Sequence, residues 1–194
     1  MQPLEHRSAQ APKRRSAIFV RGDRVLLRSP RAGDRDEWVK LRRANWRHLR
    51  AAEPTPEPRT DPCGDVAFRR LLDGAFTDRT LRLLVCTSLD QRIIGQITFG
   101  GISRGCFQSC FIGYWMGRAF TGQGLMIEAL SLATKFAFAQ LDLHRIEANI
   151  APSNHVSRAV AKRCGFRYEG RARRLLHLAG RWRDHERWAI VRNR

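Results

Sequence analysis

Residues 111–130 constrain the fold most, because an apolar stretch runs into a turn with two glycines and then into a helical pattern. Gly122 and Gly124 lie where side chains would keep a ligand away from the backbone. The amides of residues 122–126 are expected to be the unpaired first-turn donors of the helix. Such donors, with the positive end of the helix dipole, suit an anion such as a pyrophosphate. The glycine spacing alone also fits an ordinary loop.

Two common nucleotide-binding motifs are absent from this segment. It contains no Gly-x-x-x-x-Gly-Lys-Ser/Thr sequence, and Ile127 occupies the position of the third glycine in Gly-x-Gly-x-x-Gly. The sequence therefore disfavours ATP and NAD as ligands of the turn.

The composition indicates one globular domain, since the chain has 194 residues and is 43% hydrophobic. It contains no long apolar run and no apolar centre of a signal peptide, so we expect a cytoplasmic protein without membrane association. Its 5 cysteines lack paired Cys-x-x-Cys spacing, which disfavours a disulfide framework and a structural zinc site. Cys110 could be a nucleophile, but no motif fixes a histidine beside it.

The formal net charge of +18 predicts attraction to RNA, ribosomes or other acidic surfaces. Almost all of this charge comes from arginine, which could also reflect the base composition of a GC-rich genome. No basic run is interleaved with aromatic residues as in RNA-binding sheets, so nucleic-acid binding is not expected to be the main function. The origin of the arginine excess stays open.

The order of the patterns predicts an α+β fold with a mixed, mostly antiparallel twisted sheet flanked by helices. Residues 1–22 are basic and lack periodicity, and we expect them to form a flexible arm before a domain at 23–194. The expected strands cover residues 24–28, 81–87, 93–99, 107–116, 144–150, 175–178 and 182–191, and the expected helices begin near residue 33 and cover 66–72, 122–140 and about 154–164.

Four motifs occur in the order found in a known family. They are Gly-Gln-Gly-Leu-Met from Gly122 with the following Glu-Ala-Leu, Leu-His-Arg-Ile-Glu-Ala-Asn from Leu143, Asn154-x-x-Ser157 with Lys-Arg-Cys-Gly-Phe, and Glu169-Gly with Gly-Arg-Trp-Arg-Asp-His. With them, residues 25–191 resemble the GNAT acetyltransferases, specifically the RimJ/RimL-type ribosomal-protein N-terminal acetyltransferases. The first and last motifs look most like the RimJ branch. The resemblance implies the GNAT fold.

The resemblance also implies acetyl-CoA as cosubstrate and no metal. The strand that ends at Gly117 would hold the pantetheine arm, and the glycine turn would hold the pyrophosphate. Thr121 and Met126 depart from the usual family pattern. Met at the second position is familiar in the RimJ branch, so Thr121, which lacks a longer polar side chain, is the departure that bears on the affinity for acetyl-CoA. The implied cofactor-binding residues are Trp115, Met116, Gly117, Thr121, Gly122, Gln123, Gly124, Leu125, Met126, Asn149, Asn154 and Ser157. Tyr114 and Trp115 are interpreted first as core aromatic residues and second as residues that line the cofactor site.

Two residues are candidates for catalysis. The resemblance implies that Ser157 donates a hydrogen bond to the leaving thiolate, although it could be only a surface hydroxyl; Asn154 is expected to cap the same helix. An α-amine has a reference pKa near 8 and a lysine near 10.4, so deprotonation at pH 7 costs about 1 and about 4.6 kcal/mol respectively. An N-terminal amine therefore needs little help from a base. A water molecule relayed to Glu147 or to backbone carbonyls could take the proton, and an ion-pair role is the alternative for Glu147.

The acceptor implied by the resemblance is the N-terminal alanine of a ribosomal protein. We expect a monomer or dimer that also associates with ribosomes or rRNA through its basic surface. One alternative is acetylation of a small amine such as an antibiotic or polyamine, which the positive charge disfavours because such amines are polycations. The other is a non-catalytic ribosome- or RNA-binding module, which would not need the four motifs.

Overall fold

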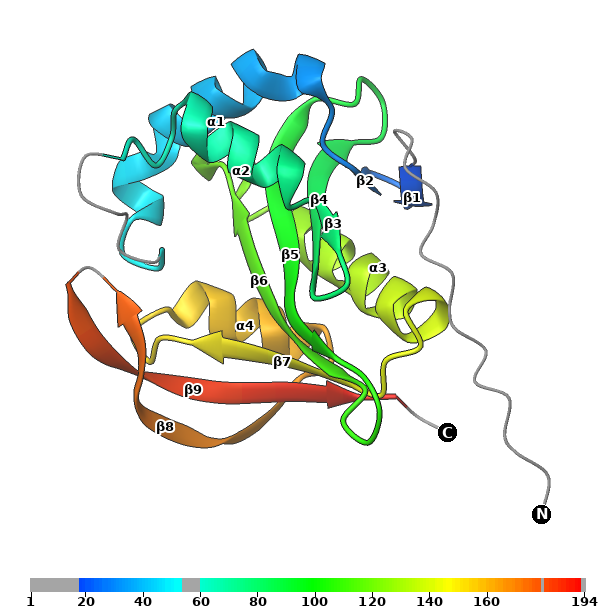
Figure 1. Ribbon diagram of the computed structural model, residues 1–194, viewed down its shortest axis with the longest axis vertical. Helices are drawn as coiled ribbons and strands as arrows, with labels where there is room; N and C mark the ends of the chain where they lie inside the picture. Colours follow the sequence, from blue (N-terminus) through cyan, green and yellow to red (C-terminus); the bar gives the residue numbers. More distant parts are fainter. Residues whose placement is uncertain (1–17, 54–59, 179, 193–194) are drawn as a thin grey trace.

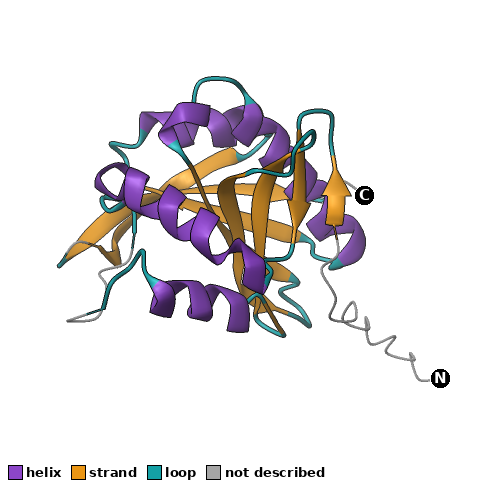
Figure 2. Cartoon of the chain, turned by 90° about the horizontal axis from the view of Figure 1, so that it is seen from above, coloured by secondary structure: helices purple, strands orange, loops and turns teal. Residues whose placement is uncertain are grey.

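The computed structural model describes residues 18–53, 60–178 and 180–192, and within them the strands form one sheet of 9 strands. The strand order is β1-β2-β4-β5-β6-β7-β9-β8, with β3 paired to β4 off this path (Figure 1). Helices cover both faces of the sheet (Figure 2). The α+β class with a mixed sheet, predicted from the sequence, is confirmed.

The strands are β1 (Ile18–Arg21), β2 (Val25–Arg28), β3 (Phe76–Thr77), β4 (Thr80–Thr87), β5 (Ile93–Ser103), β6 (Ser109–Met116), β7 (Arg145–Ile150), β8 (Arg167–Leu178) and β9 (Arg181–Val191). The helices are α1 (Arg35–Leu49), α2 (Asp65–Asp73), α3 (Leu125–Gln140) and α4 (His155–Arg163). Short 3-10 turns at Ala32–Asp34 and Arg118–Phe120 precede α1 and the glycine turn. Within the described residues, no helix is both long enough and apolar enough to cross a membrane.

Several boundaries differ from the prediction; β5, for example, extends to Ser103 instead of ending at residue 99. Ile18–Arg21, expected in the flexible arm, form β1, because this segment pairs with β2 and the Phe19 ring packs on Phe136 with centroids 5.3 Å apart. Residues 1–17 of the predicted arm lie outside the described residues. Helix α3 begins at Leu125 rather than near residue 122, because the intervening glycines adopt positive φ angles. Strand β8 begins at Arg167, well before residue 175, and its arginine-rich sequence and two register irregularities obscure the strand pattern.

Alternate residues of the strands face two hydrophobic clusters. In β2, Val25 and Leu27 join the larger cluster with α3, whereas Leu26 joins a smaller cluster with Trp38 of α1 and Phe68 of α2. This alternation is the period of two expected of a strand buried on both faces. The sheet therefore separates α3 from the α1–α2 pair.

Strands β6 and β7 form the parallel pair in an otherwise antiparallel sheet. They are hydrogen-bonded only from Ser109 opposite Arg145 to Phe111 opposite Glu147. Beyond that point the strands diverge, as Figure 1 shows. The second half of β6 therefore has one edge that β7 does not cover.

Candidate functional site

A cavity of about 450 Å³ lies beside the second half of β6, the half that β7 does not pair with. The end of β6, the glycine turn, the starts of α3 and α4, and the end of α1 contribute to its wall. Of the residues predicted to bind the cofactor, Trp115, Met116, Thr121, Gly122, Gly124, Leu125, Met126, Asn154 and Ser157 line it. The structure thus brings together segments that are far apart in the sequence.

The turn before α3 leaves the helix N-terminus open. Gly122 and Gly124 have φ angles of 78° and 76°, in the left-handed region that favours glycine. Gly124 is the N-cap residue, and no side chain caps the helix within the described part of the chain. A Cβ atom on Gly122 would meet nothing within 4 Å. The first-turn amides of α3 therefore remain available for an anion at the cavity wall.

An ion pair from the β1–β2 turn braces this open N-terminus. Glu128, in the first turn of α3, accepts hydrogen bonds from the Arg24 backbone N–H at 2.8 Å and from Arg24 Nε at 2.9 Å. Arg24 Nη1 also donates to the carbonyl oxygen of Gln123 at 2.9 Å. Burial tends to raise the pKa of the Glu128 carboxyl, but these hydrogen bonds outweigh it and lower the pKa. The turn is thus held by charge-assisted contacts from a distant segment.

Two predicted residues support the turn instead of lining the cavity. Gln123 uses its side-chain Nε2 to donate to the Ala119 carbonyl at 2.9 Å. The Gly117 N–H donates to the Ile94 carbonyl at 2.9 Å, and a Cβ atom on Gly117 would lie 2.9 Å from Leu41 Cδ1. A side chain at position 117 would therefore displace the end of the Leu41 side chain on α1, and the Gly117 N–H is already bonded within the protein.

The start of α4 brings the predicted Ser157 against a tyrosine from β6. Asn154 Oδ1 accepts a hydrogen bond from the Ser157 backbone N–H at 3.0 Å, so the predicted N-cap is present. Ser157 Oγ donates to Tyr114 Oη at 2.8 Å, and Tyr114 Oη donates to the Ser157 carbonyl at 3.0 Å. Burial raises the pKa of Tyr114 to about 12, so its hydroxyl stays protonated at neutral pH. Tyr114 and Ser157 form a hydroxyl pair in the cavity wall.

Sequence reasoning missed the hydrogen bond between Tyr114 and Ser157. The signal was its alternation with buried residues of β6, Ile112 and Met116 among them, because a phenol hydroxyl on a buried face needs a hydrogen-bond partner. The sequence could not identify that partner, which is 43 residues away along the chain.

Comparison with known proteins identifies the family. Residues 24–167 match the family model described as acetyltransferase (GNAT) domain. The chain belongs to this family. The GNAT fold predicted from the four motifs is thereby confirmed.

Two curated relatives and one solved structure illustrate the similarity. The probable N-acetyltransferase YjcK of Bacillus subtilis (strain 168) is 42% identical over 107 residues, which cover 55% of this chain and 59% of that protein. The ribosomal protein uS5-alanine N-acetyltransferase of Escherichia coli (strain K12) is 41% identical over 102 residues, 53% of each chain. The chain thus spans little more than half the length of these relatives. The Mycobacterium smegmatis RimJ structure, in complex with CoA-disulfide, superposes with a TM-score of 0.78 at 34% identity, covering 86% of this chain and 81% of that chain.

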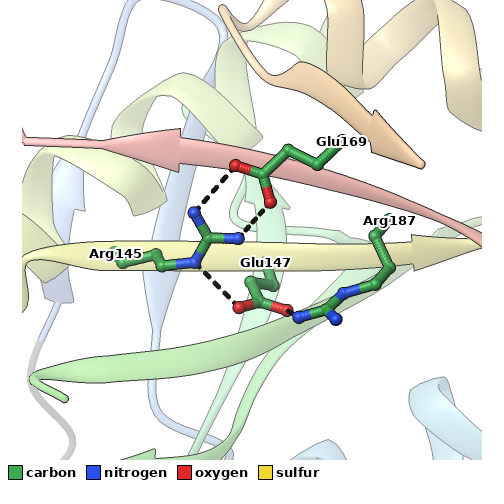
Figure 3. A network of polar contacts seen from close by, with 4 residues as sticks. All are labelled: Arg145, Glu147, Glu169 and Arg187. Atoms are coloured by element: carbon green, nitrogen blue, oxygen red, sulfur yellow. Dashed lines mark hydrogen bonds and ion pairs between the residues drawn. The ribbon is translucent and has the colours of Figure 1, made fainter.

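In this GNAT domain, Glu147 is part of an ion-pair network that joins β7 to β8 and β9 (Figure 3). Glu147 is not among the cavity-lining residues. Its carboxylate accepts hydrogen bonds from Arg145 Nε at 2.8 Å and Arg187 Nη2 at 2.9 Å, and Arg145 also pairs with Glu169. Burial tends to raise the pKa of Glu147, but the two arginines outweigh it and lower the pKa. The catalytic role of Glu147 stays a prediction, and these contacts favour the ion-pair alternative.

Asn149, two residues further along β7, also lies outside the cavity wall. Its Oδ1 atom is buried and has no hydrogen-bond partner among the described residues. An unsatisfied buried carbonyl is costly, so this atom remains able to accept a hydrogen bond from a ligand. Its predicted contact with the cofactor stays a prediction.

The thiol alternative is not supported by the geometry. Cys110 is buried on β6, and burial raises its pKa to about 12, which keeps the thiol protonated and unreactive at neutral pH. The other described cysteines are also free thiols.

The end of α1 supplies a part of the cavity that sequence reasoning missed. His48, Leu49, Ala52 and Glu53 line it there. A signal was available in the sequence, since Trp38, Arg42 and Trp46 recur every four residues and so share one face of the helix. Only the fold shows that this face meets Trp115 of β6 and the carboxylate of Glu53.

Proposed function

We propose that this GNAT domain binds acetyl-CoA in the cavity beside the second half of β6 and transfers the acetyl group to the N-terminal α-amine of a protein. The observation that carries the proposal is the open N-terminus of α3 in the same cavity as the Ser157–Tyr114 hydroxyl pair. The first feature suits a pyrophosphate and the second suits a leaving thiolate.

The cofactor is held mainly by backbone groups in this proposal. The amides of residues 122–126 bind the pyrophosphate, and Arg163, which also lines the cavity, adds positive charge. The pantetheine arm lies along the edge of β6 that β7 leaves uncovered after Phe111. These contacts do not depend on the side chain of Thr121, and this explains how the cradle tolerates a departure from the usual family pattern.

Transfer proceeds by direct attack of the amine on the thioester carbonyl. A C–N bond forms, the C–S bond breaks, and the electron pair of that bond leaves on sulfur. The Ser157 hydroxyl stabilises the thiolate by donating a hydrogen bond, after rotating away from Tyr114 Oη; the Tyr114 hydroxyl holds the Ser157 backbone in place. The amine loses one proton to water before the attack, at a cost of about 1 kcal/mol for an α-amine at pH 7. A second proton leaves the nitrogen as the amide forms, and passes through solvent to the thiolate, which departs as the thiol of CoA.

The acceptor proposed is the N-terminal alanine of a ribosomal protein. The similarity to the uS5-alanine N-acetyltransferase supports it. The net charge of +18 also supports it, because it attracts the domain to rRNA and would repel polycationic small amines.

Incubation with acetyl-CoA and a set of acceptors tests the proposal. The set contains peptides that begin with Ala, Ser or Met, small amines including spermidine, and purified ribosomal proteins, with products mapped by mass spectrometry. We expect one acetyl group on the α-amine and a preference for alanine. Acetylation confined to lysine side chains or small amines would refute the proposal, and salt-sensitive ribosome binding without transfer would favour a binding module.

A further inference from the structure

Glu53 contributes the only carboxylate among the described residues that line the cavity. The other ionisable side chains in this wall belong to His48, Arg163 and Tyr114. The side chain of Glu53 is 25% exposed, so it reaches solvent within the cavity while remaining mostly enclosed. The chain as a whole has a net charge of +18 and repels cations, but this carboxylate provides a local negative charge that attracts a cation.

A buried arginine fixes the position of this carboxylate. Arg42 Nη1 donates to Glu53 Oε1 at 2.7 Å, and the Arg42 side chain is only 7% exposed. The guanidinium lies 5.4 Å from the Trp38 ring, 5.6 Å from the Trp46 ring and 5.1 Å from the Trp115 ring. Three aromatic contacts restrict the guanidinium, and its fixed planar geometry restricts the carboxylate in turn.

The ion pair does not use the whole hydrogen-bonding capacity of Glu53. An ionised carboxylate accepts about four hydrogen bonds, and the contact with Arg42 uses one oxygen. Within the described residues, no donor contacts Oε2. Trp115 connects the ion pair to the cavity, because its ring contacts the Arg42 guanidinium and the residue also lines the cavity. Glu53 is thus held in the wall of the same cavity that contains Ser157.

We propose that Glu53 binds the ammonium group of the incoming acceptor, with Arg42 as the residue that positions its carboxylate. This inference rests on the proposed function and adds a residue of the cavity wall that binds the acceptor. An ammonium group offers three N–H donors and a positive charge, which suit an enclosed carboxylate oxygen. If Glu53 serves only to neutralise Arg42, its substitution will not affect how the protein discriminates between an acceptor with an ammonium group and one with a hydrogen atom in its place.

A binding cycle between protein and ligand separates these two roles. The probes are a peptide that begins with alanine and the same peptide lacking its α-amino group, each titrated by calorimetry into the protein saturated with CoA. We expect the wild type to bind the peptide with the amine roughly 10-fold or more tightly than the other, as one charge-assisted hydrogen bond allows. Glu53→Gln keeps an oxygen for Arg42 but removes the charge, and should bind both peptides within about twofold.

Asp36→Asn is the matched control. It removes one carboxylate from α1 whose side chain is 89% exposed and which does not line the cavity. This variant should discriminate between the two peptides as the wild type does. Thermal unfolding and CoA titration of each variant verify that the fold and the cofactor site are intact.

Three outcomes would overturn the inference: Glu53→Gln discriminates as well as the wild type does, it loses affinity for both peptides equally, or the wild type itself does not discriminate. Failure of the proposed function is a separate result, because it is seen as absent transfer to α-amines by the wild type. Steady-state kinetics provide a second measurement. We expect Glu53→Gln to raise KM for the peptide about 10-fold and to change kcat by less than about threefold.

Discussion

Helices α3 and α4 both begin at the cavity, yet their N-termini are built in opposite ways. Helix α3 starts from a left-handed glycine, Gly124, and within the described residues no side chain caps it. Helix α4 starts from Asn154, whose side chain accepts a hydrogen bond from the Ser157 N–H. One N-terminus keeps its donors for a ligand, and the other satisfies a donor within the protein.

Burial explains why the two helices can differ. Helix α3 spans 16 residues and buries one side in the core, which stabilises it without a cap. The buried residues of α3 are Leu125, Met126, Ala129, Leu130, Ala133, Thr134, Phe136 and Ala137. Helix α4 spans 9 residues and buries only Ala161 among them, so it depends more on its cap. Substitutions should therefore affect ligand binding at α3, and turnover or stability at α4.

The largest effect is expected from Ser157→Ala at the start of α4. Loss of the donor to the leaving thiolate should lower kcat about 100-fold, in line with other single donors to a developing negative charge. The dissociation constant for CoA should change little, because the pyrophosphate lies at α3 in our proposal. Rapid-mixing or steady-state assays with a peptide acceptor measure kcat, and calorimetry measures the dissociation constant for CoA.

Ser131→Ala is the control for this comparison. Its hydroxyl lies on α3, contacts Cys164 Sγ at 3.6 Å and does not line the cavity. It should retain full turnover. A Ser157→Ala enzyme with wild-type kcat would remove the proposed role of the hydroxyl.

The next effect is expected from Gly122→Ala at the start of α3. A methyl group there meets no protein atom within 4 Å, but it would occupy the space of the proposed ligand. We expect CoA affinity to fall about 10-fold, equivalent to loss of a hydrogen bond to a charged group. The positive φ of 78° should also cost about 1 kcal/mol of unfolding free energy. Calorimetry with CoA and urea denaturation measure the two effects.

Gly105→Ala is a matched control, since Gly105 has a φ of 67° and equally open space around it but lies outside the cavity wall. It should show the same loss of stability with unchanged CoA affinity. An equal loss of CoA affinity in both variants would mean that backbone strain, and not contact with the ligand, explains the result at Gly122.

The sequence predicted the two helix starts well because each depends on local chemistry. Glycines before α3 and Asn154 before α4 act on backbone groups within a few residues, so their roles could be inferred without the fold. The hydrogen bond from Ser157 to Tyr114 and the contact of Arg42 with Trp115 join segments that are distant in the sequence. Such contacts depend on strand register and helix docking, which the local pattern does not determine.

Asn154→Ala tests how much the N-cap of α4 contributes to the stability of the protein. Removing the cap should cost about 1 kcal/mol of unfolding free energy, measured by urea denaturation. Asn154→Asp restores a capping oxygen and should restore the stability. If Asn154 also contacts the cofactor, the added negative charge in Asn154→Asp would weaken CoA binding, so unchanged CoA affinity in this variant would limit Asn154 to capping.

The smallest effect is expected from Glu147→Gln, which lies at neither helix start. Because its arginine partners lower the pKa of Glu147, its contribution to stability is fully present above the ordinary glutamate pKa of about 4.3 and is lost as the pH falls through the lower pKa of the folded protein. The variant should therefore be less stable than the wild type by up to ~1 kcal/mol at pH 7, and this difference should shrink below about pH 4. Urea denaturation at several pH values measures this difference.

The turnover of the same variant distinguishes the two roles of Glu147. If Glu147 is only an ion-pair partner, Glu147→Gln should change kcat by less than about threefold, whereas loss of a general base should lower kcat about 100-fold or more. A loss of that size, with stability unchanged, would place the base on β7 and make the two helix starts only part of the catalytic site.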